Sequence, residues 1–299
     1  MIQEVNLPLV SVIMPTYNRK YIIKDAIDSC LIQSYKNIEI IICDDHSTDG
    51  TKEYIKERMK EDARIKYCVT PEGKKGANAA RNTAIKMSKG KYIVFLDTDD
   101  YLTQDSILKR VELFSKYNVG MVYGNMLCES SQSNRKAKAF FIDIKAENLN
   151  QKKYLMQELS LCSQITIMVK ASVFRKIGLL DEEQKAWTDD GLVVAVGMHY
   201  PILHSGEFVA VARISEGSMI SNKWNSYLGC KILVKKYKKQ IIQYASFWRY
   251  LLWQIRLFSL YCYAREMSED FESLKRKVWQ TFHILTRKII WPFFRNHFE

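Results

Sequence analysis

Blocks of apolar and polar residues alternate along the first 125 residues. Short runs rich in β-branched and aromatic residues predict strands at about 9–14, 38–44, 64–69, 91–97 and 119–124. Between these runs, apolar residues at spacings of three and four predict helices at about 20–34, 51–62, 77–88 and 104–117. Such alternation requires right-handed crossovers and gives a mostly parallel sheet. The predicted fold class is therefore α/β, an open, mostly parallel sheet flanked by helices.

The pattern changes in the rest of the chain. Residues 129–138 are polar and predict a loop or a flap, and a less regular stretch follows to about residue 220. Beyond it the sequence is strongly helical, with no proline from 202 to 291. We therefore expect one domain over residues 1–220, made of halves at about 1–125 and 126–220, and a C-terminal helical extension over residues 221–299.

Carboxylates follow two of the predicted strands. Asp44 and Asp45 end one apolar run, and Asp97, Asp99 and Asp100 end another. The carboxyl ends of parallel strands open into a crevice where ligands bind. Carboxylates crowded there repel one another unless a cation or hydrogen-bond donors compensate, which predicts a divalent metal and a polar ligand. Capping of the following helices is the alternative, and it stays open for Asp44 in particular.

Composition indicates a globular protein in a reducing compartment. With 299 residues, 47% of them hydrophobic, the chain is long enough for a large core. Its seven cysteines show neither a CxxC pair nor a zinc-like spacing, which is typical of the cytoplasm. The first residues lack the basic start and the long apolar run of a signal peptide, so we expect a cytoplasmic protein.

Positive charge is concentrated at the C-terminal end. Residues 221–299 contain 15 Lys and Arg but five acids, against a net charge of +12 for the whole chain, and they hold five of its six Trp. A basic, Trp-rich segment favours an anionic surface, either lipid headgroups or nucleic acid. The segment has no recognisable nucleic-acid motif, so we expect an anionic membrane surface and no nucleic acid as partner.

The apolar stretch 244–263 is the one candidate for a membrane span in this segment. Arg249 and Arg256 interrupt it, and each would cost about 2.5 to 3.5 kcal/mol near the middle of a span. A span is therefore not expected. On a helix the two arginines share one face and a mostly apolar set forms another: Trp248, Leu251, Leu252, Ile255, Ser259 and Cys262. Packing on the catalytic domain and lying in a membrane interface are both compatible with this pattern.

Four segments resemble, in order, the signatures of family 2 glycosyltransferases with the GT-A fold. They lie within about the first 100 residues, and the order of all four is more specific than any one of them. The segments are Val12 to Arg19 (VIMPTYNR), Asp44 to Thr51 (DDHSTDGT), Gly76 to Asn82 (GANAARN) and Phe95 to Asp100 (FLDTDD).

The resemblance implies a metal-dependent, inverting enzyme that moves a sugar from a nucleotide sugar, most commonly a UDP-sugar, to a saccharide acceptor. Asp97 and Asp99 match the DxD motif that holds Mn²⁺ or Mg²⁺ on the donor diphosphate, and the adjacent Asp100 is a third candidate ligand. The nucleotide-binding half would be residues 1–125 and the acceptor-binding half residues 126–220. The implied donor-binding residues are Pro15, Thr16, Tyr17, Asp45, Arg81, Asp97, Thr98 and Arg213.

An inverting transfer also needs a carboxylate that removes the proton of the acceptor hydroxyl. The segment 178–192 resembles the family's stretch that ends in Glu-Asp, which puts Asp189 in the place of the base, with Thr188 replacing the usual Glu. Asp190 is one residue away and remains the alternative, and both could instead cap a helix over 191–199. In the Arg-rich, Ser-rich loop that follows, the frequent His is absent, because Ser215 stands two residues after Arg213.

Two other classes of function compete with this interpretation. A nucleotidyltransferase also places a metal on Asp residues, but it usually has a Gly-rich loop bearing Lys or Arg after the first strand, where this chain has Pro15 to Asn18. A non-catalytic homologue that binds sugar nucleotides or membranes would not need both the DxD motif and Asp189. The basic tail further suggests a peripheral protein at the inner face of the plasma membrane, with a lipid-linked acceptor used in surface polysaccharide or glycan biosynthesis.

Overall fold

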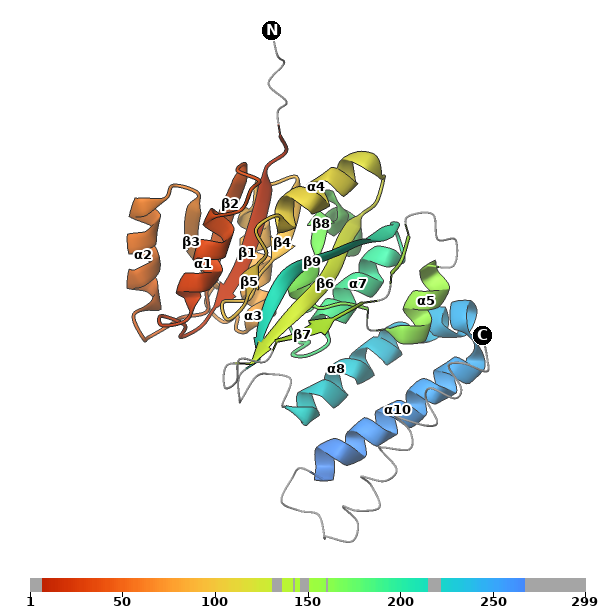
Figure 1. The fold of residues 1–299 in the computed structure, drawn as a ribbon. Helices are drawn as coiled ribbons and strands as arrows, with labels where there is room; N and C mark the ends of the chain where they lie inside the picture. Colours follow the sequence, from red (N-terminus) through yellow and green to blue (C-terminus); the bar gives the residue numbers. More distant parts are fainter. Residues whose placement is uncertain are drawn as a thin grey trace. The chain divides into compact units, whose positions relative to one another are not determined.

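The computed structural model describes residues 7–130, 136–141, 143–145, 151–159, 161–214 and 222–266 (Figure 1). These residues form two compact units. The first, here called the sheet unit, takes the described residues of Met1–Gln151, Ser160–Glu183 and Thr188–Glu216. The second, the helical unit, takes those of Lys152–Leu159, Gln184–Trp187 and Gly217–Glu299. The helical unit therefore includes two short pieces from the middle of the chain, of eight and four residues, in addition to the C-terminal segment.

One sheet runs through the sheet unit in the order β3-β2-β1-β4-β8-β6-β9-β5, with β7 paired to β6. The first four strands in this order, β3, β2, β1 and β4, are parallel to one another. Strand β8 is antiparallel to both β4 and β6, and β9 is parallel to β6. The strands are β1 (Val10–Thr16), β2 (Ile38–Asp44), β3 (Ile65–Val69), β4 (Tyr92–Phe95), β5 (Tyr101–Leu102), β6 (Met121–Ser130), β7 (Lys136–Ala139), β8 (Met168–Lys170) and β9 (Ile202–Ile214).

Helices connect the strands of the first half as predicted, with ends that differ by a few residues. The helices of the sheet unit are α1 (Ile23–Leu31), α2 (Thr51–Glu61), α3 (Ala77–Met87), α4 (Ser106–Lys116), α6 (Phe174–Ile177) and α7 (Thr188–Gly197), with 3-10 turns η1 (Gln164–Thr166) and η2 (Ala171–Val173). The other helices are α5 (Gln151–Glu158), α8 (Lys223–Lys236), α9 (Lys238–Gln240), the π-helical η4 (Ile241–Ala245) and α10 (Phe247–Glu266).

The core explains why the first strands read as continuous apolar runs. Val12, Ile40 and Val94 point to one face of the sheet, where α1, α2 and α4 bury their apolar residues. Helix α3 packs against β1, β2 and β3, whose other face carries Ile13 and Ile41. Strands covered on both faces cannot alternate apolar with polar residues. The α/β fold class with a sheet flanked by helices is confirmed.

Parallel register brings the two acidic clusters to the same edge of the sheet. Thr16 at the end of β1 is the register partner of Asp44 at the end of β2, and Asp45 N–H donates to Thr16 O (2.8 Å). On the other side of β1, the Leu96 N–H donates to Ile13 O (3.0 Å), which leads directly to Asp97. The carboxyl ends of β1, β2 and β4 thus form one rim, here called the carboxyl rim.

In the helical unit, α8 packs against α10, and both predicted faces of α10 contain buried residues. Arg249 is buried, and the Arg256 guanidinium lies over the rings of Trp187 (5.6 Å) and Trp253 (4.9 Å). On the predicted apolar face, Leu252, Ser259 and Cys262 are buried, whereas Trp248 and Ile255 are exposed. Arginine stacks on aromatic rings with its charge intact, so the arginine side of α10 packs inward. Of the described helices, none is both long and apolar enough to cross a membrane.

A buried carboxylate joins three strands at the amino end of the sheet. Glu39 in β2 accepts hydrogen bonds from Ser11 Oγ (2.5 Å) and the Lys89 N–H (2.7 Å), and it pairs with Lys66 (2.5 Å). Burial by itself would raise the pKa of Glu39, but these donors outweigh burial and hold the pKa below its ordinary value of 4.5. The charged form of Glu39 is therefore favoured by folding.

Replacing Glu39 by Gln should lower the free energy of unfolding by about 1 to 2 kcal/mol at pH 7, because the buried donors lose a charged acceptor while Lys66 is partly exposed. A lowered pKa stabilises the fold above pH 4.5, and this contribution is lost as the pH falls through the folded-state pKa. Urea unfolding at pH 7 and pH 3.5 measures both effects. The difference between wild type and Glu39→Gln should shrink at the lower pH, and the exposed Glu112→Gln serves as control. An equal difference at both pH values would contradict this assignment.

Candidate active site

Hydrogen bonds between two loops build one side of the carboxyl rim. Asn18, at the start of the β1–α1 loop, donates its backbone N–H to Ser47 Oγ (2.8 Å), and the Lys20 N–H donates to Asp49 Oδ2 (3.1 Å). Asn18 and His46 both have positive φ angles, 52° and 64°, so each loop turns sharply at this point. The polar residues that follow β1 and β2 thus hold the two loops against each other.

The neighbouring residues Asp44 and Asp45 have different partners. Asp44 is buried and accepts hydrogen bonds from Ser47 N–H (3.0 Å), Ser47 Oγ (2.5 Å) and the Tyr67 hydroxyl (2.9 Å). Asp45 Oδ2 accepts the Gly76 N–H (2.7 Å) just ahead of α3, where Gly76 has a φ of 97°. Asp44 therefore shapes its own turn, whereas Asp45 joins the rim to the start of α3.

Arg81 on α3 is the buried cation of the rim. Its side chain is 5% exposed, and it donates from Nη2 to Asp97 Oδ1 (2.6 Å) and from Nη1 to Asn78 Oδ1 (3.1 Å). Its Nε is also buried and has no hydrogen-bond partner among the described residues. A guanidinium held in this way keeps a fixed orientation, and its planar donors suit carboxylate and phosphate oxygens.

Two asparagines of α3 hold the loop that precedes the candidate base. The Asn82 side chain donates to Leu180 O (2.9 Å) and accepts the Leu180 N–H (2.9 Å), which completes a two-bond pair with the backbone. Asn78 donates to Asp181 O (2.7 Å), and Glu182 pairs with Lys74 (2.8 Å). Helix α3 thus contacts both the DxD turn, through Arg81, and the loop around residue 181.

The DxD turn is crowded with carboxyl groups. Burial, and then repulsion from Asp97, raises the pKa of Asp99, and the same two causes raise the pKa of Asp100 to about 8. Asp100 Oδ1 accepts the Arg213 N–H (2.9 Å), and the Arg213 guanidinium pairs with Asp25 (2.7 Å) and lies 5.0 Å from the Tyr101 ring centre. The turn therefore carries more negative charge than the arginines near it neutralise.

Asp189 lies in the first turn of α7, within the electrostatic reach of the Arg81–Asp97 pair. Burial raises the pKa of Asp189, Arg81 opposes that rise, and Asp97 adds to it. Asp189 Oδ1 accepts the N–H of the more buried Asp190 (3.0 Å). A capping residue precedes the first residue of its helix. Because α7 begins at Thr188, both Asp189 and Asp190 lie inside the helix and do not cap it. Asp189 is therefore electrostatically coupled to Arg81 and the DxD turn.

The remaining predicted donor-binding residues lie along the same rim. Pro15 and Thr16 are buried at the end of β1, Thr98 is buried in the DxD turn, and Tyr17 is 57% exposed. The Thr16 hydroxyl oxygen, like Asp45 Oδ1, is buried without a hydrogen-bond partner among the described residues. The Arg-rich, Ser-rich segment predicted over 211–221 is described only as far as residue 214, where β9 ends. Trp279 and Trp291 of the tail also lie outside the described residues.

The donor chemistry of the DxD turn fits a divalent cation that is shared with a ligand. The carboxyl groups of Asp97 and Asp99 are hard oxygen donors. Burial, and then repulsion from Asp97, raises the pKa of Asp99, and a cation would offset this cost of its charged form. In the part of the chain that the structure describes, no group of three or more His, Cys, Asp or Glu side chains is arranged to hold a metal. Mg²⁺ typically takes one or two carboxylates and completes its shell with phosphate oxygens and water.

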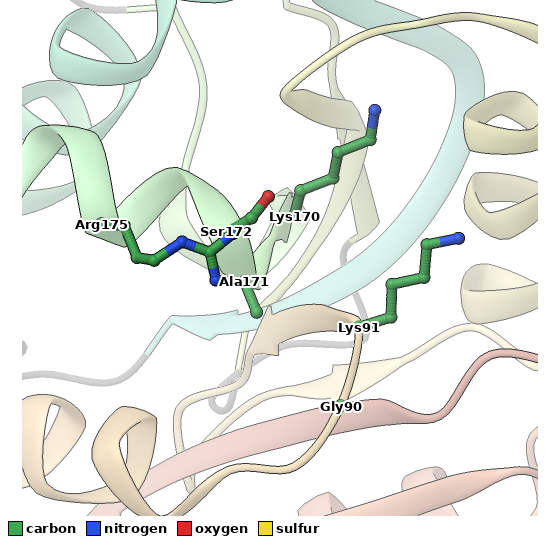
Figure 2. A pocket seen from close by; sticks show the side chains of 6 residues that line it. All are labelled: Gly90, Lys91, Lys170, Ala171, Ser172 and Arg175. Atoms are coloured by element: carbon green, nitrogen blue, oxygen red, sulfur yellow. The ribbon is translucent and has the colours of Figure 1, made fainter.

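A hollow of about 330 Å³ lies at the amino end of β4, on the side of the sheet opposite the carboxyl rim (Figure 2). Gly90 and Lys91 precede β4, and Lys170 ends the antiparallel β8, so these residues are at the amino end of β4, whereas Asp97 follows its carboxyl end. The Lys91 and Lys170 ammonium groups lie over the rings of Tyr92 and Phe114. The hollow is therefore separate from the carboxyl rim, and packing on aromatic rings accounts for its two lysines.

The asparagines of α3 were missed by the sequence analysis. Asn78 and Asn82 lie one helical turn apart on α3, and with Arg81 they form a polar set on a helix that is otherwise rich in alanine. Buried polar side chains on a helix made mostly of small residues indicate hydrogen bonds to the backbone of another segment. That signal could have been read, but it did not identify the loop around residue 181 as the partner.

Comparison with known proteins decides the family. The family described as Glycosyl transferase family 2 matches residues 11–178, more than half of the chain. The chain belongs to glycosyl transferase family 2. The match covers β1 through α6, with the carboxyl rim and Arg81, and it ends before Asp189. The family predicted from the four motifs is therefore confirmed, while the role of Asp189 rests on local sequence and geometry.

A curated relative of this family 2 chain is the UDP-Glc:alpha-D-GlcNAc-diphosphoundecaprenol beta-1,3-glucosyltransferase WfgD of Escherichia coli. The two are 43% identical over 117 residues, which are 39% of this chain and 45% of the relative. The chain spans about half of the length of four other curated relatives, between 41% and 50%. Similarity to these relatives therefore covers about half of this chain or less and half of each relative at most.

Solved structures of glycosyltransferases share the fold over most of the chain. Residues 1–349 of S. aureus TarS in complex with UDP-GlcNAc superpose with a TM-score of 0.65 at 18% identity, over 93% of this chain and 81% of that one. The mannosyltransferase PcManGT of Pyrobaculum calidifontis, in complex with GDP-Man and Mn²⁺, gives 0.58 at 16% identity, over 97% and 83%. These likenesses confirm the predicted GT-A fold.

Proposed function

We propose that the protein is an inverting glycosyltransferase that moves a sugar from a nucleotide sugar, a UDP-sugar, to a saccharide acceptor. The observation that carries the proposal is the convergence of Arg81, Asp97 and Asp189. A buried guanidinium holds the first Asp of the DxD turn, and the charges of both act on the Asp189 carboxyl. Membership of the family and the UDP-sugar named for two similar proteins support the choice of donor.

Donor binding is assigned to the carboxyl rim. Pro15, Thr16, Tyr17 and Asp45 would surround the base, and Arg81 would meet the diphosphate with Thr98 and Arg213 beside it. The excess of carboxylates in the DxD turn supports a cation there, held by Asp97 and Asp99, with Asp100 as a further candidate, as Mn²⁺ or Mg²⁺. When bound, the cation would offset the negative charge that builds on the diphosphate as it leaves.

Asp189 would act as the general base. Its raised pKa makes the carboxylate a stronger proton acceptor, and its carboxyl group would take the proton of the acceptor hydroxyl as that oxygen attacks the anomeric carbon. Attack from the face opposite the diphosphate inverts the configuration of the sugar. Arg81 would meanwhile keep Asp97 oriented, because its two bonds to Asp97 and Asn78 fix the guanidinium plane.

The acceptor and the location are proposed from the helical unit. Exposed apolar side chains on α10, namely Trp248 (61% exposed), Ile255 (37%) and Phe258 (47%), accompany the basic charge of residues 221–299. Such a surface suits a peripheral position on an anionic membrane. A relative is named for a diphosphoundecaprenol-linked acceptor. We therefore propose a lipid-linked saccharide acceptor at the inner face of the plasma membrane, in surface polysaccharide biosynthesis.

A panel of nucleotide sugars with Mn²⁺ and a saccharide acceptor, scored for release of nucleoside diphosphate, tests the activity and the base together. Asp189→Asn should abolish measurable turnover, while the affinity for the nucleotide measured by calorimetry stays within about twofold, because the base acts on the acceptor. Asp190→Asn is the matched control and should retain most turnover. Normal turnover in Asp189→Asn with loss in Asp190→Asn would assign the base to the neighbouring residue. Absence of release with every donor would overturn the proposed activity.

The metal assignment predicts a strong effect at Asp99. Asp99→Asn should reduce turnover at least a hundredfold, the scale of losing a major electrostatic contribution to the transition state. Excess EDTA should stop the reaction, and added Mn²⁺ should restore it. Titration of Mn²⁺ in the presence of nucleoside diphosphate should also show weaker metal binding in this variant. Full activity in EDTA would contradict the assignment.

The membrane assignment predicts binding to anionic liposomes that depends on salt. Each basic residue near the surface contributes up to about 1 kcal/mol, and salt screens this attraction. The protein should co-sediment with anionic liposomes at low salt, release partly at high salt, and bind neutral liposomes poorly. The double variant Trp248→Ala, Phe258→Ala should bind less at either salt concentration. A folded full chain that ignores anionic liposomes at low salt would remove the argument for a lipid-linked acceptor.

A further inference from the structure

Residues 184–187 are the part of the helical unit that lies directly ahead of the candidate base. The chain leaves the sheet unit after Glu183, contributes Gln184–Trp187 to the helical unit, and returns at Thr188. Asp189 follows Trp187 by two residues. Whatever fixes the conformation of this segment, here called the strap, therefore acts through two peptide bonds on the backbone that carries Asp189.

Trp187 joins the strap to both α8 and α10. Its indole Nε1 donates to Ser226 Oγ of α8 (3.2 Å), and its ring meets the buried Trp253 ring of α10 edge to face, with centres 6.4 Å apart. The Arg256 guanidinium lies over both rings. Aromatic edge-to-face packing and cation–π contact both depend on ring orientation, so α8 and α10 together specify how the Trp187 side chain lies.

The backbone of the strap is equally constrained. Trp187 has a φ of 59°, in the left-handed region, where a bulky side chain is an outlier that the surrounding contacts must enforce. The Gln184 side chain donates to Trp187 O (2.6 Å), an oxygen of the peptide group that links Trp187 to Thr188. The helical unit therefore fixes the peptide plane from which α7 starts.

Gly229 on α8 shows how closely the helix approaches the strap. A Cβ atom at this position would lie 2.3 Å from Ala186 O and 2.8 Å from Ala186 C, both of them backbone atoms. A side chain of any size at position 229 must therefore displace the strap or the helix. Glycine is needed there for this approach, whereas the neighbouring Leu228 is 39% exposed.

We propose that the helical unit positions the catalytic base: α8 and α10 hold the strap, and the strap sets where the first turn of α7 presents Asp189. The proposal rests on the proposed role of Asp189 as general base. Trp187, Ser226, Gly229 and Trp253 are positioning residues and touch neither donor nor acceptor in this scheme. A displacement of about 1 Å in a catalytic group can reduce the rate by two orders of magnitude, so small shifts of the strap should be visible in turnover.

The test compares Gly229→Ala with Leu228→Ala in the full chain, using the nucleotide-sugar donor and acceptor that give turnover with wild type. Gly229→Ala should lower kcat at least tenfold, with the affinity for nucleoside diphosphate and the KM for donor within about twofold of wild type. Leu228→Ala should behave as wild type.

Ser226→Ala provides a second, milder variant if Gly229→Ala does not fold. It removes only the hydrogen bond to Trp187, and it should lower kcat about threefold to tenfold without weakening nucleotide binding. Ser226→Thr keeps a hydroxyl at this position and should restore most of the turnover. Recovery in Ser226→Thr distinguishes the bond itself from a general loss of packing.

Each outcome decides between the two proposals. Normal kcat in folded Gly229→Ala and Ser226→Ala, together with an inactive Asp189→Asn, would overturn the positioning role and leave the proposed base intact. An equal loss of nucleotide affinity and turnover would mean that the helical unit only stabilises the sheet unit, and it would also overturn the inference. Substantial turnover in Asp189→Asn would instead refute the base, and the positioning of that base with it.

Discussion

The Arg81–Asp97 ion pair is the interaction on which the proposed chemistry depends. Its guanidinium is almost fully buried, whereas the Asp97 side chain is 36% exposed, so the pair joins the core to the open rim. The same guanidinium acts on Asp189. Without Arg81, carboxylates from β4 and α7 would repel one another with no buried cation to offset them. One side chain on α3 therefore makes it possible for both acidic elements to occupy one rim.

The carboxyl rim has more carboxyl groups than arginines that could neutralise them. Asp97, Asp99, Asp100 and Asp189 carry carboxyl groups at or near the rim. Arg19 and Arg213 also lower the pKa of Asp99, and Arg213 is paired with Asp25 in the structure. Burial, and after it repulsion from Asp97, raises the pKa of both Asp99 and Asp100. A stable fold does not need such an arrangement, but a site that binds a cation together with a diphosphate does.

The first half of the fold could be predicted from sequence because its strands are covered on both faces and read as continuous apolar runs. The shared rim also followed, since parallel strands bring their carboxyl ends together. The motif residues were harder to interpret. Asp44 matches the signature, yet it bonds Ser47 and Tyr67, and local sequence does not distinguish a carboxylate that shapes its own loop from one that meets a ligand.

Long-range contacts explain what the sequence did not predict. The arginines of α10 were placed on one face from the sequence pattern alone, with no indication of their partners. Arg256 stacks its guanidinium on two tryptophans that are 66 residues apart in the chain, Trp187 and Trp253. Asn82 gave no hint of its backbone partner at Leu180, which is 98 residues away. Such pairings depend on tertiary structure, and no local periodicity encodes them.

The most direct test of the central claim is calorimetric titration of UDP, with Mn²⁺ present, into the wild-type chain and Arg81→Gln, with thermal melts to verify folding. If Arg81 organises a diphosphate site on the carboxyl rim, wild type binds UDP and folded Arg81→Gln binds at least tenfold more weakly. Equal affinity in the two proteins would contradict the account.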